Sequence, residues 1–457
     1  MIKDGLIYDG LGNEPIKTDL GVSKGKICRI GSIDEDQAYK VISASGDVVC
    51  PGFIDFHSHA DFALLNEPES YAKIQQECGG ILDVIYDYHG LTKLTKATLP
   101  GIWAYMDLLP VRDPQSIVSL GEGETPLLST PRLGKHLNLS SLYIKNETLE
   151  PTGSFKDRPI SVAVSKAKEL GAKTVVTSSS GNAGASVAAY AARAGLECYV
   201  FVPATVPKDK LTQIRMYGAQ VVMVGGQFSN AYHVAREISK RHGWFNLTST
   251  FASPYPTEAD KTVAYEIWEQ FDGELPDWIL IPIASGPLLV GVHKGFRELK
   301  TIGLIKKIPR LIGVQAEWCA PIARAFATGS KVVAWGQPET VASGISDSLA
   351  GYEQDGDYTL WAIKQSNGYA VSVSDQEIIR ASQGLARFEG IYAETTGAAS
   401  VAGAEKLLAM KVIKPTEQVV CVVTGSGFKD NAFFAKTLPD LPVVSSVEEA
   451  EKLIAAK

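Results

Sequence analysis

The chain has 457 residues, of which 45% are hydrophobic and 21% are charged, which is the composition of an ordinary globular protein of two or three domains. Its 44 Lys and Arg residues against 51 Asp and Glu residues give a net charge of −7, which argues against a nucleic-acid surface or an anionic-membrane surface. No apolar run approaches the ~20 residues of a membrane span, no secretion signal is visible, and the six cysteines are scattered, so we expect a cytoplasmic protein without a disulfide framework.

Residues 1–66 are predicted to form a small β-domain of short strands. Glycines recur between the apolar segments, as the turns of β-hairpins require. The expected strands are Gly5 to Tyr8, Asp19 to Val22, Ile27 to Ile30, Val41 to Ser43, and Val48 to Val49.

From Leu142 onward, short apolar strands alternate with helical patterns. This alternation is typical of parallel strands joined by helical crossovers, an α/β architecture with helices on both faces of the sheet. The expected strands are Leu142 to Ile144, Thr174 to Thr177, Cys198 to Val202, Val221 to Val224, Trp278 to Ile283, Leu311 to Gln315, and Val419 to Val423.

One lysine lies on a glycine-containing turn between a strand and a helix. The stretch Pro151-Thr152-Gly153-Ser154-Phe155-Lys156-Asp157-Arg158 places Lys156 directly before the helical pattern that runs from Asp157 to Leu170. The positive end of a helix favours loss of the lysine proton, and a neutral, held lysine is what Schiff-base chemistry requires. An isolated lysine of this kind is usually a surface residue, so the prediction depends on the other turns.

Three more glycine-rich turns follow apolar strands, and in an open parallel sheet such turns meet at the carboxyl edge, where ligands bind. Each turn alone could be an ordinary strand–helix joint. Ser179 to Asn182 begins a helix and suits a carboxylate or phosphate. Ala284 to Leu288 contains small residues that let backbone amides approach an anion. The last is Thr424-Gly425-Ser426-Gly427.

From about residue 70 to 445, the chain resembles the threonine synthase family of pyridoxal 5'-phosphate enzymes, within the tryptophan synthase β superfamily. The matching motifs, in family order, are Glu77 to Gly80, Gly121 to Leu127, Pro151 to Arg158, Ser179 to Ser186, Gly313 to Glu317, Glu394 to Ala399, and Thr424 to Asp430. The resemblance implies fold type II, with two parallel-sheet α/β domains and the cofactor between them, plus the N-terminal β-domain. It implies a large cofactor-binding domain of residues 67–165 and 250–457 and a small α/β domain of residues 166–249.

The resemblance also implies roles for individual residues. Lys156 would bind the cofactor covalently through its amine and then move protons on the substrate carbons. Asn182 would bond the phenolic oxygen of the cofactor, with Ser179, Ser180, Gly181 and Asn182 around the substrate carboxylate. The cofactor phosphate would be held by Ala284, Ser285, Gly286, Pro287 and Leu288. Thr424 would bond the pyridine nitrogen, and a hydroxyl there makes the ring a weaker electron sink, which suits elimination and replacement.

One stretch departs from the family pattern. Threonine synthases usually carry Asn-Ser-x-Asn-Pro-x-Arg before Glu-Gly-Gln-Lys-Thr, and part of it grips the phosphate of O-phosphohomoserine. Here the run is Thr250 to Pro256 and then Glu258-Ala259-Asp260-Lys261-Thr262, with Phe251 in place of a hydroxyl and Pro256 in place of the arginine. Neither side chain donates the paired bonds that arginine makes to phosphate. We therefore hypothesise a non-phosphorylated amino-acid substrate. For a phosphorylated substrate, the alternative is that Lys261 or Lys208 binds the phosphate in place of the missing arginine.

The first 66 residues resemble the start of amidohydrolases of the D-aminoacylase and dihydroorotase type, through Ile7 to Gly12, Gly21 to Ile27, and Pro51 to Asp61. In those enzymes, the counterparts of His57 and His59 bind metal. A catalytic zinc site needs about three protein ligands, and the later barrel strands that supply the others are missing here. We expect no metal centre, and we expect this segment to serve packing or oligomer contact.

These features predict a pyridoxal-phosphate lyase that acts on a small amino-acid substrate, and the family resemblance implies a homodimer. Four alternatives stay open. They are a serine/threonine dehydratase-like eliminase, a β- or γ-replacement enzyme, a metal hydrolase, and an inactive cofactor-binding subunit or scaffold. The substrate, its leaving group and any effector are not defined by the sequence.

Overall fold

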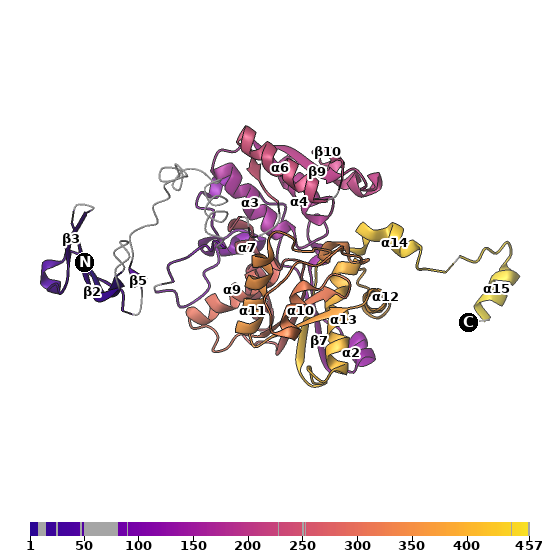
Figure 1. Ribbon diagram of the computed structural model, residues 1–457. Coiled ribbons are helices and arrows are strands. Elements are labelled where there is room, and N and C mark those ends of the chain that lie inside the picture. The colour runs from indigo at the N-terminus through magenta and orange to yellow at the C-terminus, as the bar shows by residue number, and fades with distance from the viewer. Residues whose placement is uncertain are drawn as a thin grey trace. The chain divides into compact units, whose positions relative to one another are not determined.

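The computed structural model describes residues 1–7, 15–23, 26–45, 48–49, 81–88, 90–226, 228–248, 251, 253–439 and 441–455. The chain divides into two compact units, Met1–Ser70 and Tyr71–Lys457, which are drawn together in Figure 1. Each unit is described by itself. The motif Glu77 to Gly80, Thr250, and the histidines His57 and His59 lie outside the described residues.

The first unit contains a five-stranded sheet in which the strand order is β3-β2-β1-β4, with β5 also paired to β1. Neighbours β1, β2 and β3 run antiparallel, whereas β4 and β5 run parallel to β1. Ile7 and Leu20 are buried between the strands and hold the sheet together. The bounds are β1 Ile2–Ile7, β2 Ile16–Ser23, β3 Lys26–Ile30, β4 Ile42–Ser43, β5 Val48–Val49, and the short helix η1 Glu35–Gln37.

The second unit contains two sheets, and the smaller one has the order β10-β9-β8-β11, with all neighbours parallel. Apolar residues of α3, α4 and α5 cover one face of it, and residues of α6 pack with Val176 and Phe201 on the other. Its elements are α3 Asp157–Glu169, β8 Thr174–Thr177, α4 Asn182–Ala194, β9 Glu197–Pro203, α5 Thr212–Met216, β10 Gln220–Val224, α6 Phe228–His242, and β11 Phe245–Asn246.

The larger sheet has six strands in the order β14-β13-β12-β15-β7-β6. Five of them are parallel, and β6 joins the edge antiparallel to β7. The expected strands are present, but the sequence analysis did not anticipate β6, β11 and β14, which are short or lie at sheet edges. The bounds are β6 Leu127–Ser129, β7 Ser141–Asn146, β12 Trp278–Pro282, β13 Arg310–Ala316, β14 Tyr369–Val373, and β15 Gln418–Val423.

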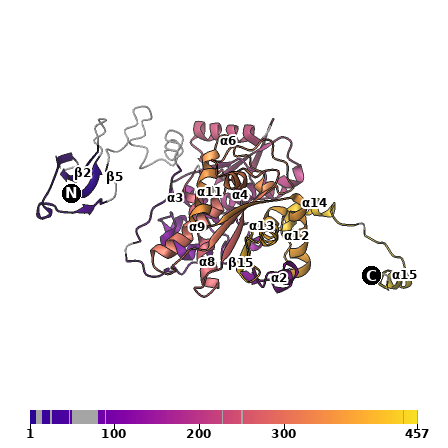
Figure 2. The same ribbon diagram turned by 60° about the horizontal axis from the view of Figure 1, so that its bottom comes forward.

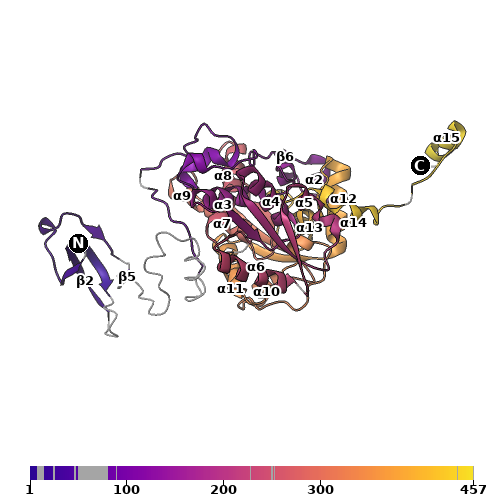
Figure 3. The same cartoon turned by 90° about the horizontal axis from the view of Figure 1, so that it is seen from above.

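Strand residues of the larger sheet point alternately into two hydrophobic cores, because successive side chains of a strand face opposite sides. Ile279 and Ile281 enter the core that is shared with α8, α9, α10 and α11, whereas Leu280 enters the core that is shared with α2, α12 and α13. Figure 2 shows α8 and α9 on one side of β15 and α12 and α13 on the other, and α10 and α11 lie side by side in Figure 3. Burial on both faces explains why these strands read as continuous apolar runs.

The remaining elements connect and cover this unit. They are η3 Gly101–Leu108, η4 Pro114–Ser116, α2 Pro131–Leu137, η5 Glu147–Leu149, η6 Lys208–Leu211, α7 Tyr255–Asp260, α8 Thr262–Gln270, α9 Pro287–Thr301, α10 Pro321–Thr328, η7 Ser343–Ile345, α11 Glu353–Gln365, α12 Asp375–Glu389, α13 Thr395–Ala409, η8 Gly427–Asp430, α14 Asn431–Ala435, and α15 Val447–Ala455.

Candidate active site

The turn that carries Lys156 pairs with the turn that carries Thr424. The backbone N–H of Phe155 donates to the carbonyl of Thr424 at 3.0 Å, and the N–H of Ser426 donates to the carbonyl of Gly153 at 2.9 Å. Gly153 has a φ of 85°, a conformation that glycine adopts without strain. Because β7 and β15 are neighbouring parallel strands, the two turns that follow them meet at the carboxyl edge of the larger sheet.

Lys156 lies immediately before α3, and its side chain is half-buried. Its Nζ is 4.7 Å from the centre of the Phe155 ring. Burial lowers the pKa of Lys156, while the carboxylates of Asp260 and Asp347 act in the opposite direction. Since burial outweighs these two charges, the amine loses its proton more readily than an exposed lysine does.

The first turn of α3 is fastened by the carboxyl group of Asp157. This group accepts hydrogen bonds from the backbone N–H of Thr152 at 2.6 Å, from the Thr152 hydroxyl at 2.7 Å, and from the Ser186 hydroxyl of α4 at 2.7 Å. Burial raises the pKa of Asp157 to about 6, although these donors oppose the rise. The lysine is thus held on a turn whose backbone is fixed from both sides.

The segment Ser179 to Asn182 begins α4, as the sequence predicts. The N–H of Gly181 donates to the Ser179 hydroxyl at 3.3 Å, and the Asn182 side-chain amide donates to a carboxylate oxygen of Glu394 at 2.8 Å. Burial raises the pKa of Glu394 to about 7. The N–H of Glu394 in turn donates to the carbonyl of Gly425 at 3.0 Å, so this side-chain pair links α4 with the Thr424 turn.

The segment Ala284 to Leu288 follows β12 and begins the long helix α9. Gly286 has a φ of 101°, and a side chain there would overlap Thr359. The Thr359 hydroxyl donates to the carbonyl of Ser285 at 2.5 Å, and the Gln315 amide donates to the carbonyl of Ala284 at 3.4 Å. The turn is therefore held by its carbonyls, which leaves the amides at the helix start suited to an anion such as a phosphate.

Two buried hydroxyls at the paired turns find no hydrogen-bond partner among the residues that the structure describes. They are those of Thr424, which is 1% exposed, and of Ser154, which is fully buried. Buried polar groups are almost always hydrogen-bonded, so an unpaired hydroxyl indicates a partner outside the described residues, such as a bound ligand. A heterocyclic nitrogen is a suitable acceptor for Thr424, and together with the narrow Ala284 to Leu288 turn this fits pyridoxal phosphate.

Three acidic residues of this region escaped the sequence analysis as site residues. Glu394 contacts Asn182, whereas Asp260 and Asp347 act electrostatically on Lys156. Glu394 belongs to a motif that carried the family resemblance, and Asp260 lies in the run that departs from it, so the sequence contained a signal for both. Asp347 follows no recognisable motif and is identified only by the fold.

The stretch that differs from the family pattern contains Phe251, Pro256 and Lys261. Phe251 is buried, with its ring centre 5.4 Å from that of Tyr358, and Pro256 lies in α7. Lys261, one alternative cation for a substrate phosphate, is buried and bonded to Glu258 and Glu298, both at 2.9 Å. Lys208, the other, is exposed on η6.

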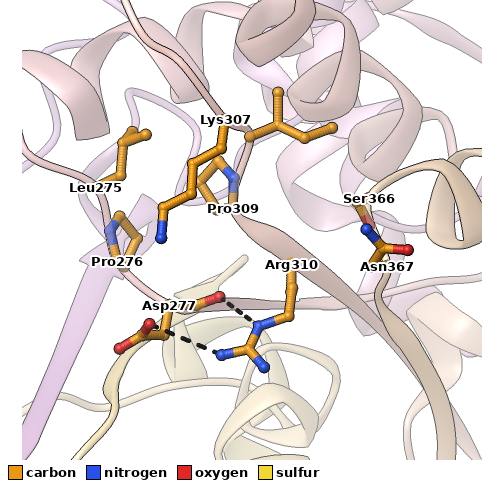
Figure 4. Close-up of a pocket in the computed structure, with 9 residues that line it drawn as sticks. Leu275, Pro276, Asp277, Lys307, Pro309, Arg310, Ser366 and Asn367 are labelled. Carbon is orange, nitrogen blue, oxygen red and sulfur yellow. Dashed lines mark hydrogen bonds and ion pairs between the residues drawn. The ribbon is translucent and has the colours of Figure 1, made fainter.

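A separate pocket lies where β12 and β13 begin, at the end of the strands away from these turns (Figure 4). Asp277 and Arg310 line it, and the Arg310 Nε donates to the carbonyl of Asp277 at 3.3 Å. The sequence-predicted site residues follow the strands at the carboxyl edge, so this pocket contains none of them. In parallel sheets ligands bind at the carboxyl ends of the strands.

The described part of the chain shows neither a metal-ligand cluster nor a membrane span. Within that part, no three His, Cys, Asp or Glu side chains gather as metal ligands would, and no helix has the length and apolarity for crossing a bilayer.

Comparisons with known proteins agree with this geometry. Residues 118–425 match the family described as pyridoxal-phosphate dependent enzyme. The chain is 41% identical over 362 residues to threonine synthase of Methanocaldococcus jannaschii (78% of this chain, 88% of the relative). It is 41% identical over 360 residues to threonine synthase of Methanosarcina acetivorans (78% and 87%). Among solved structures, it is similar to threonine deaminase isoform 2 from Solanum lycopersicum, with a TM-score of 0.61 and 25% identity over 78% of this chain and 93% of that one.

Proposed function

The chain belongs to the pyridoxal-phosphate-dependent enzyme family, and from this premise we propose that it is a lyase of the threonine synthase type whose proton-moving group is Lys156. Its substrate is an amino acid that carries a leaving group beyond Cα. The observation that carries this proposal is the pairing of the Lys156 turn with the Thr424 turn, whose buried hydroxyl lacks a partner among the described residues.

When bound, pyridoxal phosphate withdraws electrons from the substrate Cα and thereby makes its proton removable. Lys156 accepts this proton at its Nζ. Its burial supports the role, because the lowered pKa increases the share of neutral amine that can act as a base. The fixed backbone around Asp157 keeps the amine in one place.

The other three turns bind the substrate and the cofactor. Ser179 to Asn182 orient the substrate through its carboxylate, since the start of α4 presents backbone amides to an anion. Ala284 to Leu288 bind the cofactor phosphate at the start of α9. Thr424 would donate a hydrogen bond from its hydroxyl to the pyridine nitrogen, which is consistent with the lack of an acceptor for this hydroxyl among the described residues. The resemblance also supports a location in the cytoplasm and a homodimer, and light scattering of the purified chain tests the dimer.

The proposal is tested by locating the cofactor on the chain. Borohydride treatment of the cofactor-loaded protein should fix the cofactor irreversibly to one lysine, and peptide mass spectrometry should identify that residue as Lys156. In the Lys156→Ala variant, both the fixed cofactor and the turnover of amino acids should be lost. Labelling of another lysine, or full turnover by the variant, contradicts the proposal. An inactive scaffold is distinguished because it would carry the cofactor without turning over any amino acid.

A second candidate is an eliminase of the serine/threonine dehydratase kind. It is favoured by the similarity in fold to a protein named as threonine deaminase. A screen of amino acids for release of ammonia and a 2-oxo acid separates this reaction from the formation of threonine.

A further inference from the structure

The groups that act on the Lys156 amine are acidic. Asp260 and Asp347 both favour its charged form. Asp260 is the last residue of α7, which packs against α3 and α9. A side chain at Gly291 of α9 would overlap the Cβ of Asp260, so this aspartate is closely confined between helices.

Asp260 is 1% exposed, and its Oδ1 has no hydrogen-bond partner among the described residues. The charged groups that act on it are Lys156 and Arg158 of the α3 region, which favour the carboxylate, and Glu147 of η5, which disfavours it. Burial dominates and raises the pKa of Asp260 to about 7. A confined and buried carboxyl group that interacts electrostatically with the amine, and that has one oxygen unpaired among the described residues, is available to exchange a proton with a ligand.

The cations near this aspartate are already bound to other carboxylates. Lys261, the next residue, is held by Glu258 and Glu298. Arg158 is fully buried and bonded to glutamates. A phosphate group binds best to cations that donate charge-assisted bonds, and Lys261 and Arg158 already make such bonds to glutamates. The surroundings of Lys156 therefore suit a substrate whose leaving group is not a phosphate.

A phosphate departs from carbon without help, because its negative charge is stable in water. A hydroxyl or an amine is a poor leaving group and departs readily only when it receives a proton as the bond breaks. A general acid serves this step best when it is protonated near neutral pH and lies within reach of the departing atom.

We propose that Asp260 is the acid that protonates the leaving group of a β-hydroxy or β-amino amino acid, on the same substrate from which Lys156 takes the α-proton. This inference rests on the proposed function, because it requires Lys156 in the role given above.

In this elimination, Lys156 acts as the base and Asp260 as the acid. The Cα proton passes to Lys156 Nζ, and the electron pair of that C–H bond forms the new double bond between Cα and Cβ. The bond from Cβ to oxygen or nitrogen breaks, and its pair stays on the heteroatom. The proton of the Asp260 carboxyl group joins that atom, which departs as water or ammonia. Asp260 is left as a carboxylate, and the Lys156 ammonium can return a proton to it.

The experiment compares leaving groups in the cofactor-loaded Asp260→Asn variant. The substrates are L-serine and L-threonine, whose hydroxyl leaving groups need a proton, and 3-chloro-L-alanine, whose chloride does not. The variant should lose on the order of 10²-fold in kcat with the first two, the range for general acids, and less than about threefold with 3-chloro-L-alanine. The Asp260→Glu variant should recover part of the loss.

A matched control is Asp355→Asn. Asp355 is also buried, with burial raising its pKa to about 7, but it accepts from the backbone N–H of Phe251 at 3.4 Å instead of acting on Lys156. This control should change the rates of all three substrates by the same factor.

A second readout does not depend on turnover. In the cofactor-free protein, the pKa of Lys156 can be measured by competitive acetylation followed by mass spectrometry. Removal of the neighbouring carboxylate in Asp260→Asn should lower this pKa, because Asp260 favours the ammonium. An unchanged pKa of Lys156 contradicts the electrostatic interaction between Asp260 and this lysine.

Three other results overturn the inference. The first is an equal loss with the chloride and the hydroxyl substrates in Asp260→Asn. The second is turnover of 3-chloro-L-alanine but of neither hydroxyl substrate by the wild type. The third is a kcat/KM for O-phospho-L-homoserine above that for both hydroxyl substrates. Failure of the proposed function has a different signature, because borohydride would then fix no cofactor to Lys156 in the wild type.

Discussion

Two cations lie two positions apart at the start of α3, and their surroundings differ completely. Arg158 is fully buried and bonded to Glu147 at 2.7 Å and to Glu266 at 2.5 Å. Burial alone would disfavour its charge, but the glutamates around it raise its pKa. Lys156 instead has a lowered pKa and interacts electrostatically with Asp260, whose Oδ1 is unpaired among the described residues. The first cation is part of the folded framework, and the second is prepared for a reaction.

The comparison shows that buried polar groups with protein partners and those without them have different roles. The arginine cluster, which we define as Arg158, Lys145, Glu147, Glu150 and Glu266, has donors matched to acceptors throughout, with Lys145 bonded to Glu266 at 2.6 Å. Buried ions are tolerated when they are paired in this way. At the carboxyl edge, the hydroxyl of Thr424 and an oxygen of Asp260 stay unpaired within the described residues. Such groups cost stability, which a bound ligand can restore.

The largest effect is expected from Lys156→Ala. Turnover of any amino-acid substrate should fall by at least ~10³-fold, since both the covalent anchor and the base are removed. Thermal unfolding of the cofactor-free variant should occur at nearly the wild-type temperature, because this lysine is only half-buried. Steady-state kinetics and calorimetry check the two parts. A large loss of stability would place Lys156 with the framework and break the comparison.

The reverse pattern is expected for Arg158→Ala. The variant leaves glutamates buried without their partner, so the free energy of unfolding should fall by about 3–5 kcal/mol. Arg158→Lys keeps the charge but not the forked guanidinium donor. Its free energy of unfolding should therefore lie between those of Arg158→Ala and the wild type. Urea unfolding measures both. If Arg158→Ala is as stable as Lys156→Ala, the cluster is not the framework that we describe.

The pH dependence of stability sharpens the comparison through Glu394, which bonds Asn182. Burial raises its folded pKa to about 7 from the ordinary 4.5, so the unfolded chain releases this proton first as pH rises. For this reason, the free energy of unfolding should decrease by up to about 3 kcal/mol between pH 4.5 and 7. Glu394→Gln keeps an acceptor for Asn182 and should remove this loss, which unfolding of cofactor-free protein across that range reveals. A variant with the same pH profile as the wild type contradicts the assignment.

The smallest effect is expected from Thr424→Val. The variant removes a hydroxyl that lacks a partner among the described residues, so the cofactor-free protein should be as stable as the wild type or slightly more so. Affinity for pyridoxal phosphate should fall about fivefold, the equivalent of about 1 kcal/mol for one hydrogen bond. Thr424→Ser should bind normally. Loss of stability without loss of cofactor affinity would show that this hydroxyl serves packing.

Much of the proposed cofactor site can be predicted from local sequence. Lys156, Asn182 and Thr424 each follow a short apolar strand and a small-residue turn, and parallel strands deliver such turns to one edge of a sheet. Strands that are buried on both faces are continuous apolar runs, which makes them easy to find. The short edge strands β6, β11 and β14 were missed, because two to five residues carry too little pattern to identify a strand.

What only the tertiary structure decided is which charges meet. Lys261 was a candidate for binding phosphate, but Glu298 of α9 joins Glu258 in holding it. Asp260 and Asp347 are far from Lys156 along the chain, and no local pattern indicates that they act on it. The pKa of a buried group depends on its desolvation and on neighbours that distant segments supply. The sequence by itself therefore determined the family and the cofactor and indicated Lys156 as the proposed reactive lysine, whereas the fold decided the charges that surround that lysine.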